Sequence, residues 1–272
     1  MKEIVDSGEL GAITKIEASL AVSHLFVKDG DIRLVYELGG GAMMDMGCEF
    51  DIVVSRFLTV QSLAGYTLSM LRYITGADPT KIISAKADMD PKYPQIDTGT
   101  TATLSFPSPG GSTEPADGLT GTLYAHFRLP PLLGFLPQWS KVFVRVTGTR
   151  GTVELNNFPC PWLYHSITIE SSEHEGGRMR KRTEKQYGNL GWTTQVSSCF
   201  RLLLLSDVNG YVCRYRYQLE AFIDKLRGRN PEHWYDAQDS TTNMQWIEAI
   251  YKEVGHHIVI HPRPILFGIF AT

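Results

Sequence analysis

The middle of the chain is a succession of short segments in which apolar and polar residues alternate. A period of two is typical of strands with one buried face, and Gly, Pro, Asn or Asp separate the segments. The predicted strands are residues 12–22, 82–87, 98–106, 118–128, 141–147, 151–155 and 164–170. Because no helical pattern interrupts the last six, they predict an antiparallel sheet.

Apolar residues three and four positions apart predict helices on both sides of the strand-rich region. The predicted helices are one that starts near Gly41, after a triple glycine, and residues 66–74, 215–227 and 236–254. The charged run 173–185 is interpreted as a mobile surface loop. Together these elements predict one α+β domain, an open and predominantly antiparallel sheet with the two C-terminal helices packed on one face.

Composition and charge exclude several classes of protein. With 43% hydrophobic and 20% charged residues in 272, the chain can bury a core, which excludes disorder for most of its length. A net charge of −3 does not indicate binding to nucleic acid or to an anionic membrane. No apolar run approaches the ~20 residues of a membrane span. We therefore expect a cytoplasmic protein that binds neither nucleic acid nor a membrane.

Common catalytic and metal-binding motifs are missing. The sequence contains no G-x-G-x-x-G behind a strand, no G-x-x-x-x-G-K-[ST], no G-x-S-x-G and no H-E-x-x-H. The four cysteines lie far apart, which argues against a zinc knuckle and a disulfide scaffold. The cluster of His256, His257 and His261 lies in a tail without a nearby acidic residue. We expect no metal site.

Asp45, which follows the triple glycine, is by itself explained as a first-turn residue stabilised by the helix dipole. The segment around it, Tyr36–Cys48 (Y-E-L-G-G-G-A-M-M-D-M-G-C), resembles the C-terminal domain of the glucose-fructose oxidoreductase and inositol dehydrogenase family, Gfo/Idh/MocA. The branch it resembles most contains dimeric dihydrodiol dehydrogenases and fungal NADP-dependent D-xylose dehydrogenases. Further segments that resemble the family are 7–11, 97–102, 148–153 and 217–222.

The resemblance implies an NADP- or NAD-dependent dehydrogenase acting on the CH–OH group of a sugar or a trans-dihydrodiol. It also implies a homodimer formed through the face of the sheet. In the family, a Rossmann domain with the dinucleotide fingerprint and a catalytic Lys in an E-K-P motif precedes this domain, and this chain begins after both. We therefore expect the cofactor site to lie outside this chain, and the chain alone to be inactive.

Within the resembling helix, the family pattern D-x-G-x-Y is interrupted. Position 49 is Glu, and the expected Tyr comes only at Tyr66, so residues 49–65 are interpreted as a 17-residue insertion. Codons for Cys48–Phe50 can contain the intron start GTGAGT, and codons for Ala64–Gly65 can end an intron in CAG. We interpret the insertion as a translated intron.

Two other stretches depart from the family. A similar insertion is predicted at 195–214, and the tail 256–272 differs from the family ending. The domain is therefore predicted to span 1–255, with the tail outside it. Both insertions are expected to pack worse than their flanks.

By resemblance, Tyr66 would be the acid/base that exchanges the proton of the substrate hydroxyl, and Asp45 would orient the substrate or the ring. For Tyr66, a helix-surface aromatic is the alternative. Arg128, Trp162 and Trp192 are candidate walls of the substrate pocket, and each is equally explained as a packing residue. Two alternatives to an enzyme stay open: a cofactor-free module that self-associates through an apolar open sheet face, and a gene-model fragment without a cellular role.

Overall fold

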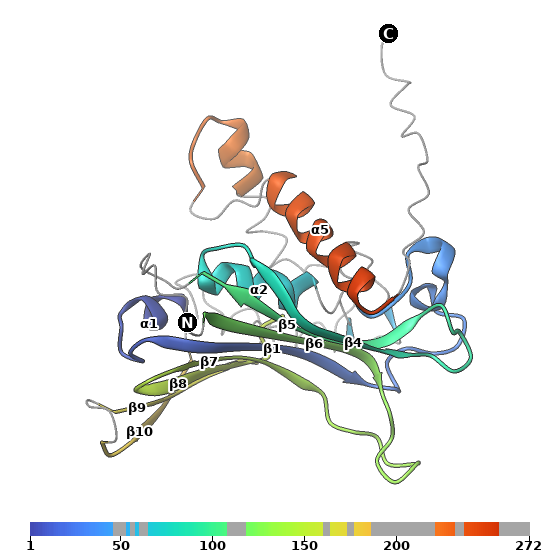
Figure 1. Ribbon diagram of the computed structural model, residues 1–272, viewed down its shortest axis with the longest axis horizontal. Coiled ribbons are helices and arrows are strands. Elements are labelled where there is room, and N and C mark those ends of the chain that lie inside the picture. Colours follow the sequence, from blue (N-terminus) through green and yellow to red (C-terminus); the bar gives the residue numbers. More distant parts are fainter. Residues whose placement is uncertain are drawn as a thin grey trace, which may run out of the picture.

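The computed structural model describes residues 1–45, 53–54, 58–59, 65–107, 118–159, 164–172, 177–185, 221–231 and 237–255. An eight-stranded sheet dominates this part of the chain, in the order β10-β9-β8-β7-β1-β6-β5-β4 (Figure 1). Its strands are β1 (Ile13–Ser23), β4 (Lys81–Met89), β5 (Asp97–Phe106), β6 (Leu119–Leu129), β7 (Lys141–Gly148), β8 (Gly151–Asn156), β9 (Ser166–Ser171) and β10 (Arg180–Glu184). The predicted open sheet is confirmed.

The first strand lies in the centre of the sheet. β1 pairs parallel with β6 and antiparallel with β7, and the other neighbouring pairs of this sheet are antiparallel. The last six residues of β1 are all buried, in keeping with a strand that has a neighbour on each side. The sheet is therefore predominantly antiparallel, as predicted, with one parallel pair at its centre.

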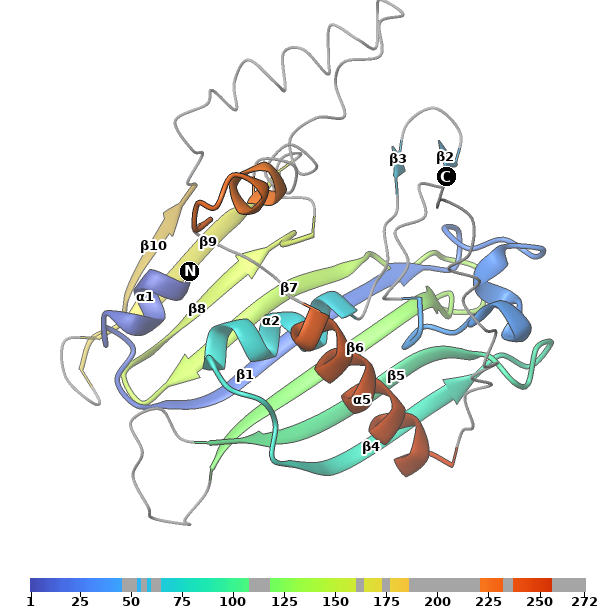
Figure 2. The same ribbon diagram turned by 90° about the horizontal axis from the view of Figure 1, so that it is seen from above.

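Two helices cover one face of the sheet. α2 (Gly65–Thr75) lies over β1 and β6, and α5 (Ala237–Glu253) crosses the sheet towards β4 (Figure 2). Shorter helical segments are α1 (Lys2–Asp6) and the 3₁₀ turns η1 (Ile32–Leu34) and η2 (Tyr36–Leu38). The helix predicted over 236–254 is confirmed, and Gly255 follows its end with a φ of +72°.

The helix predicted over 215–227 is described only from residue 221. Residues 221–226 are helical, and Gly228 follows with a φ of +69°. Phe222 and Leu226 are 51% and 71% exposed. A stripe of apolar residues therefore identifies one face of a helix but not what covers that face.

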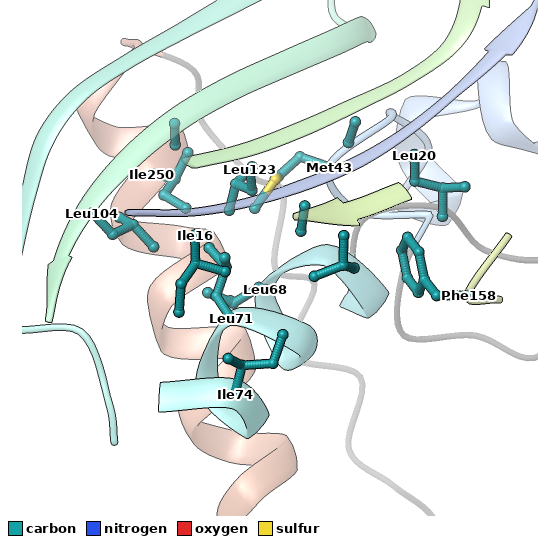
Figure 3. Close-up of a cluster of buried hydrophobic side chains, with 14 of the residues drawn as sticks. Ile16, Leu20, Met43, Leu68, Leu71, Ile74, Leu104, Leu123, Phe158 and Ile250 are labelled. Carbon is teal, nitrogen blue, oxygen red and sulfur yellow. The ribbon is translucent and has the colours of Figure 1, made fainter. Parts of the chain in front are cut away.

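The core lies between the sheet and the two helices (Figure 3). Ile16 and Leu123 from central strands, Leu68 and Leu71 from α2, and Ile250 from α5 are fully buried. Successive strand residues point to opposite faces, so the apolar set of each strand faces the helices. This pattern is what makes the strands recognisable in the sequence.

The opposite face of the sheet is polar. Thr103, Thr122, Glu17, Arg145 and Glu154 follow one another across β5, β6, β1, β7 and β8. The guanidinium of Arg145 donates to Glu154 through Nε at 2.8 Å, and the hydroxyls of Thr103 and Thr122 lie 3.3 Å apart. The expectation of an apolar open face is wrong, because most alternate residues of these strands are Thr, Ser and charged side chains, with Tyr124 and Phe143 among them.

The charged run predicted to be a loop contains an edge strand. All five residues of β10 pair with β9, and Lys181 Nζ lies 2.6 Å from Glu170 Oε1. An edge strand needs only backbone pairing, and charged side chains on it oppose further strand addition. Composition alone therefore misidentified residues 180–184, while 173–176 lie outside the described residues.

The helix predicted to start near Gly41 is present as a single turn. The Asp45 N–H donates to the Gly41 carbonyl at 2.8 Å, and residues 46–52 lie outside the described part. Further on, β2 (Val53–Val54) and β3 (Leu58–Thr59) pair with each other in a separate two-stranded sheet. Gly65, the last residue of the predicted insertion, begins α2. The rest of that insertion, the second insertion at 195–214 and the tail 256–272 lie outside the described residues.

None of the helices that the structure describes is long and apolar enough to cross a bilayer.

Candidate functional site

The triple glycine forms a tight connection between η2 and the Asp45 turn. Gly39 ends η2 with a φ of +79°, a left-handed conformation that favours glycine. Gly40 donates to the Val35 carbonyl at 3.0 Å, and a Cβ on it would lie 2.5 Å from the Arg33 carbonyl oxygen. Gly41 has a φ of +129°. Positive φ values at Gly39 and Gly41 and close backbone approach at Gly40 therefore explain why three glycines stand together.

Asp45 belongs to a buried group of charges. Arg33 Nε donates to Asp45 Oδ2 at 2.7 Å, and Arg33 Nη1 donates to both carboxylate oxygens of Asp31 at 3.2 and 3.1 Å. The side chains of Arg33, Asp31 and Asp45 are 5%, 10% and 15% exposed. Arg33 thus contacts two carboxylates in a mostly dehydrated environment.

Burial controls the acidity of Asp45. Removal from water raises the pKa of its carboxyl to about 6, and the Arg33 charge and hydrogen bond only partly oppose this; the charges of Asp31 and Asp97 raise it further. A carboxyl with a pKa near neutrality can accept or release a proton at physiological pH. Raised pKa values of this kind are found at functional sites more often than elsewhere.

A second buried carboxyl holds the same turn. Asp97, the first residue of β5, is 0% exposed, and its Oδ2 accepts hydrogen bonds from Thr100 Oγ1 at 2.7 Å and from the Met43 N–H at 3.0 Å. Its Oδ1 accepts from the Tyr251 hydroxyl at 2.8 Å, and its carbonyl accepts from the Ala42 N–H at 2.7 Å. Burial raises the pKa of Asp97 to about 6 in spite of these donors.

Tyr66 and Arg128, which were also predicted from the sequence, both lie in described elements. Tyr66 lies in the first turn of α2 and packs, partly buried, against the core. Arg128 Nη1 donates to Asp90 Oδ2 at 2.9 Å, and Nη2 donates to Asp29 Oδ1 at 3.3 Å, so its guanidinium ties β6 to two loops. The roles of both residues stay predictions.

Trp162 and Trp192, predicted as pocket walls, lie outside the described residues. Sequence reasoning did not single out Arg33, Asp97 or Tyr251. For Asp97 a signal existed: it opens the D-T-G-T-T-A segment already noted as resembling the family. Arg33 and Tyr251 reach the site only through tertiary contacts.

The described residues do not fit a dinucleotide. A Rossmann site needs a parallel strand that runs through a glycine-rich loop into the N-terminus of a helix. Here β1, the strand paired parallel with β6, is followed by a turn and the three-residue η1. The described part also holds no group of three His, Cys, Asp or Glu side chains arranged for a metal ion.

Comparison with known proteins relates this site to one family. Residues 1–65, which include the glycine turn and Asp45, match the family model of the GFO/IDH/MocA C-terminal domain. No curated protein matches the chain by sequence.

Solved structures share the fold of the chain. An aldose-aldose oxidoreductase from Caulobacter crescentus, complexed with glycerol, is 18% identical with a TM-score of 0.58. An NAD binding oxidoreductase from Klebsiella pneumoniae is 14% identical with a TM-score of 0.58. A 3-ketoreductase from Actinomadura kijaniata, in complex with TDP-benzene and NADP, is 16% identical with a TM-score of 0.54.

Each of these three comparisons covers 93% of this chain. The chain spans only 57% of the first, 60% of the second and 57% of the third structure. At this level of identity the likeness shows the fold and not the activity.

Proposed function

We propose that the chain is the substrate-binding portion of an NAD(P)-dependent oxidoreductase of the Gfo/Idh/MocA type, acting on the CH–OH group of a D-xylose-like sugar or a trans-dihydrodiol. The observation that carries this proposal is the Asp45 carboxyl, buried beside Arg33 with a pKa of about 6, on a glycine turn inside the segment that matches the family model. The fold shared with solved oxidoreductases supports it.

The charges of the site favour a neutral, hydroxyl-rich substrate over an anionic one. Arg33 is engaged by Asp31 and Asp45, so its charge is compensated within the protein. A carboxylate accepts hydrogen bonds from sugar hydroxyls, whereas it repels a phosphate or a carboxylate. Asp45 would thereby orient the substrate, and Tyr66 would exchange the proton of the reacting hydroxyl.

NADP or NAD would supply the redox chemistry, as it does for the family that the segment resembles. Two solved structures that share the fold, a 3-ketoreductase in complex with NADP and an NAD binding oxidoreductase, support this choice. Because the described residues do not fit a dinucleotide, we propose that residues other than these hold it.

We further propose a homodimer formed through the open face of the sheet. A two-fold interface must be self-complementary, and this face alternates charge along Glu17, Arg145 and Glu154, with threonines beside them. Thr122→Arg, which places a cation in the middle of the face, should then convert the dimer to a monomer in light scattering. Gln245→Arg, on an exposed position of α5, is the control. A monomeric wild-type chain would contradict the proposal.

The enzymatic proposal is tested with a repaired chain. Residues 49–65 and 195–214 are removed, a cofactor domain of the family is fused ahead of Met1, and NADP reduction is measured with D-xylose and a trans-dihydrodiol. We expect turnover that Tyr66→Phe abolishes and Asp45→Asn reduces, while Asp6→Asn, at an exposed carboxylate of α1, leaves it unchanged. Full activity of the Tyr66→Phe chain would overturn the assigned roles. A folded fusion that dimerises but turns over nothing would favour the cofactor-free module.

A further inference from the structure

The carboxylate of Asp97 connects three separate segments of the chain. Its donors come from the Asp45 turn through the Met43 N–H, from β5 through Thr100, and from α5 through Tyr251. We propose that Asp97 is the positioning residue of the Asp45 site, holding the glycine turn in the conformation that directs Asp45 towards Arg33. The role of Asp45 in a reaction rests on the proposed function, but the position of its side chain can be measured in a chain that has no enzymatic activity.

The turn depends on Asp97 at three consecutive residues. Gly41 approaches so closely that a Cβ would overlap Asp97 Oδ1. Ala42 donates its N–H to the Asp97 carbonyl at 2.7 Å, and Met43 donates its N–H to the Asp97 carboxylate at 3.0 Å. Buried backbone N–H groups must find acceptors, and the first N–H groups of a helical turn have none within the turn itself. Asp97 supplies these acceptors.

The position of Asp45 follows from that of the turn. The Asp45 N–H bonds to the Gly41 carbonyl at 2.8 Å, which fixes Asp45 one helical turn beyond the residue that touches Asp97. The Met43 side chain is fully buried in the core and prevents rotation of the turn about its axis (Figure 3). With Asp97 and Met43 as anchors, the Asp45 carboxylate meets Arg33 Nε at 2.7 Å.

The donors around Asp97 allow its hydrogen bonds to be tested separately from its negative charge. The hydroxyls of Thr100 and Tyr251 can accept as well as donate, whereas the Met43 N–H can only donate. The amide of Asp97→Asn can therefore place its oxygen towards Met43 and Thr100 and its nitrogen towards Tyr251. This variant removes the negative charge but keeps the hydrogen bond from the Met43 N–H, whereas Asp97→Ala removes the charge and this hydrogen bond.

The test follows the carboxyl of Asp45 by carbon-13 NMR in the full chain, with amide hydrogen exchange of Met43 and Asp45. In Asp97→Asn the pKa of Asp45 should fall only by the loss of the like charge, and both amides should stay protected. In Asp97→Ala the pKa should fall at least roughly one unit further, as Asp45 becomes hydrated, and exchange of both amides should rise about tenfold or more. Tyr251→Phe, which leaves the Met43 contact intact, should resemble Asp97→Asn in amide protection.

Val153→Ala is the control for a general loss of stability, because Val153 is fully buried in β8 and is not one of the residues that contact the turn. It should lower stability without moving the pKa of Asp45. If Asp97→Ala does not fold, Asp97→Ser, whose hydroxyl is one atom shorter, replaces it with the same expectation. An unchanged Asp45 pKa and unchanged amide exchange in these variants would overturn the proposal, as would equal shifts in Val153→Ala. Neither outcome depends on whether the repaired fusion is an active dehydrogenase.

Discussion

The hydroxyl of Tyr251 donates a 2.8 Å hydrogen bond to Oδ1 of Asp97, joining α5 to the start of β5 across 154 positions of sequence. Both side chains are buried, Tyr251 at 1% and Asp97 at 0% exposure. Burial and the neighbouring charge of Asp97 raise the pKa of Tyr251 well above its ordinary value, so the phenol stays protonated and acts as a donor.

Tyr251→Phe should therefore destabilise the protein by about 1–3 kcal/mol at neutral pH, because a buried carboxylate oxygen loses its donor. The loss should be smaller at pH 4.5, where Asp97 is protonated and its own proton can occupy this oxygen. Urea unfolding at pH 4.5 and 7.5 measures the difference. Equal losses at both pH values would show that Asp97 does not carry the charge assigned to it.

The raised pKa of Asp97 predicts a characteristic pH dependence. Its pKa is about 6 in the folded chain against 3.8 ordinarily, so the folded state binds this proton more tightly than the unfolded state. The resulting stabilisation is complete below about pH 4 and is lost as the pH rises through 6, a change on the order of 3 kcal/mol.

Asp97→Asn, which cannot ionise at this position, should not show this decrease in the free energy of unfolding as the pH rises. The stability of the variant relative to the wild type should therefore increase between pH 4.5 and 7, as measured by urea unfolding at intervals of half a pH unit. Parallel stability curves for the two proteins would contradict the raised pKa. Carboxyls away from Asp97 contribute equally to both curves and cancel in the difference, whereas the lower pKa of Asp45 expected in Asp97→Asn changes the difference in the same direction.

Gly41→Ala should be far more damaging than Gly30→Ala. Both glycines have positive φ values, +129° and +87°, but a Cβ on Gly41 would overlap Asp97 Oδ1 and lie 3.0 Å from the Tyr251 hydroxyl, whereas nothing lies within 4 Å of one on Gly30. We expect Gly30→Ala to cost about 1 kcal/mol from backbone strain, and Gly41→Ala at least about 2 kcal/mol more. Thermal unfolding of both variants measures this, and similar losses would remove the argument for close approach.

Most of the strands and their turns were predictable because these strands show a period of two, with one face of the sheet covered by helices. The central place of β1 was not, since strand order depends on pairings between distant residues such as Leu20 with Ala125. The apolar run from Leu20 to Val22 is the local sign of this central, buried position. β10 was missed because its residues are exposed and charged.

The site was predictable only where a motif marks it. The glycines and Asp45 lie in one short segment, and the structure shows that they form one turn. Arg33 and Tyr251 come from segments without a distinctive pattern, and their roles arise from packing. The contact between this turn and the segment that begins with Asp97 joins two motifs that the sequence shows separately.

Arg182→Ala should loosen β10 without unfolding the sheet. Arg182 Nη1 and Nη2 donate to the two carboxylate oxygens of Glu9 at 2.6 and 2.7 Å, and these bonds lower the pKa of Glu9. Because the pair is partly exposed, its loss should cost no more than about 1 kcal/mol of global stability. Amide exchange of 180–184 should nevertheless accelerate. If these amides already exchange freely in the wild type, the run is a loop after all.

Deletion of residues 49–65 should leave the eight-stranded sheet intact. Within this stretch β2 and β3 pair only with each other, so the deletion removes no strand of the large sheet. A shorter connection between Cys48 and Tyr66 also lowers the entropy cost of bringing these two ends together. We expect the free energy of urea unfolding to stay equal or rise, with a single cooperative transition. A loss of cooperative unfolding would show that the segment belongs to the fold and contradict its interpretation as an insertion.

The same deletion should extend a helix and bring the two predicted catalytic residues onto one face. Asp45 and Tyr66 would then be four residues apart, the spacing at which side chains of a helix are neighbours. The turn that begins at Gly41 would continue into α2, so circular dichroism at 222 nm should show a larger helical signal per molecule than the undeleted chain gives. Replacing 49–65 by a Gly/Ser linker of equal length is the matched control, since it removes the sequence but keeps the separation. This control should fold without the gain in helix, and an equal gain in both variants would mean that the composition of the segment, rather than its presence between Asp45 and Tyr66, limits the helix.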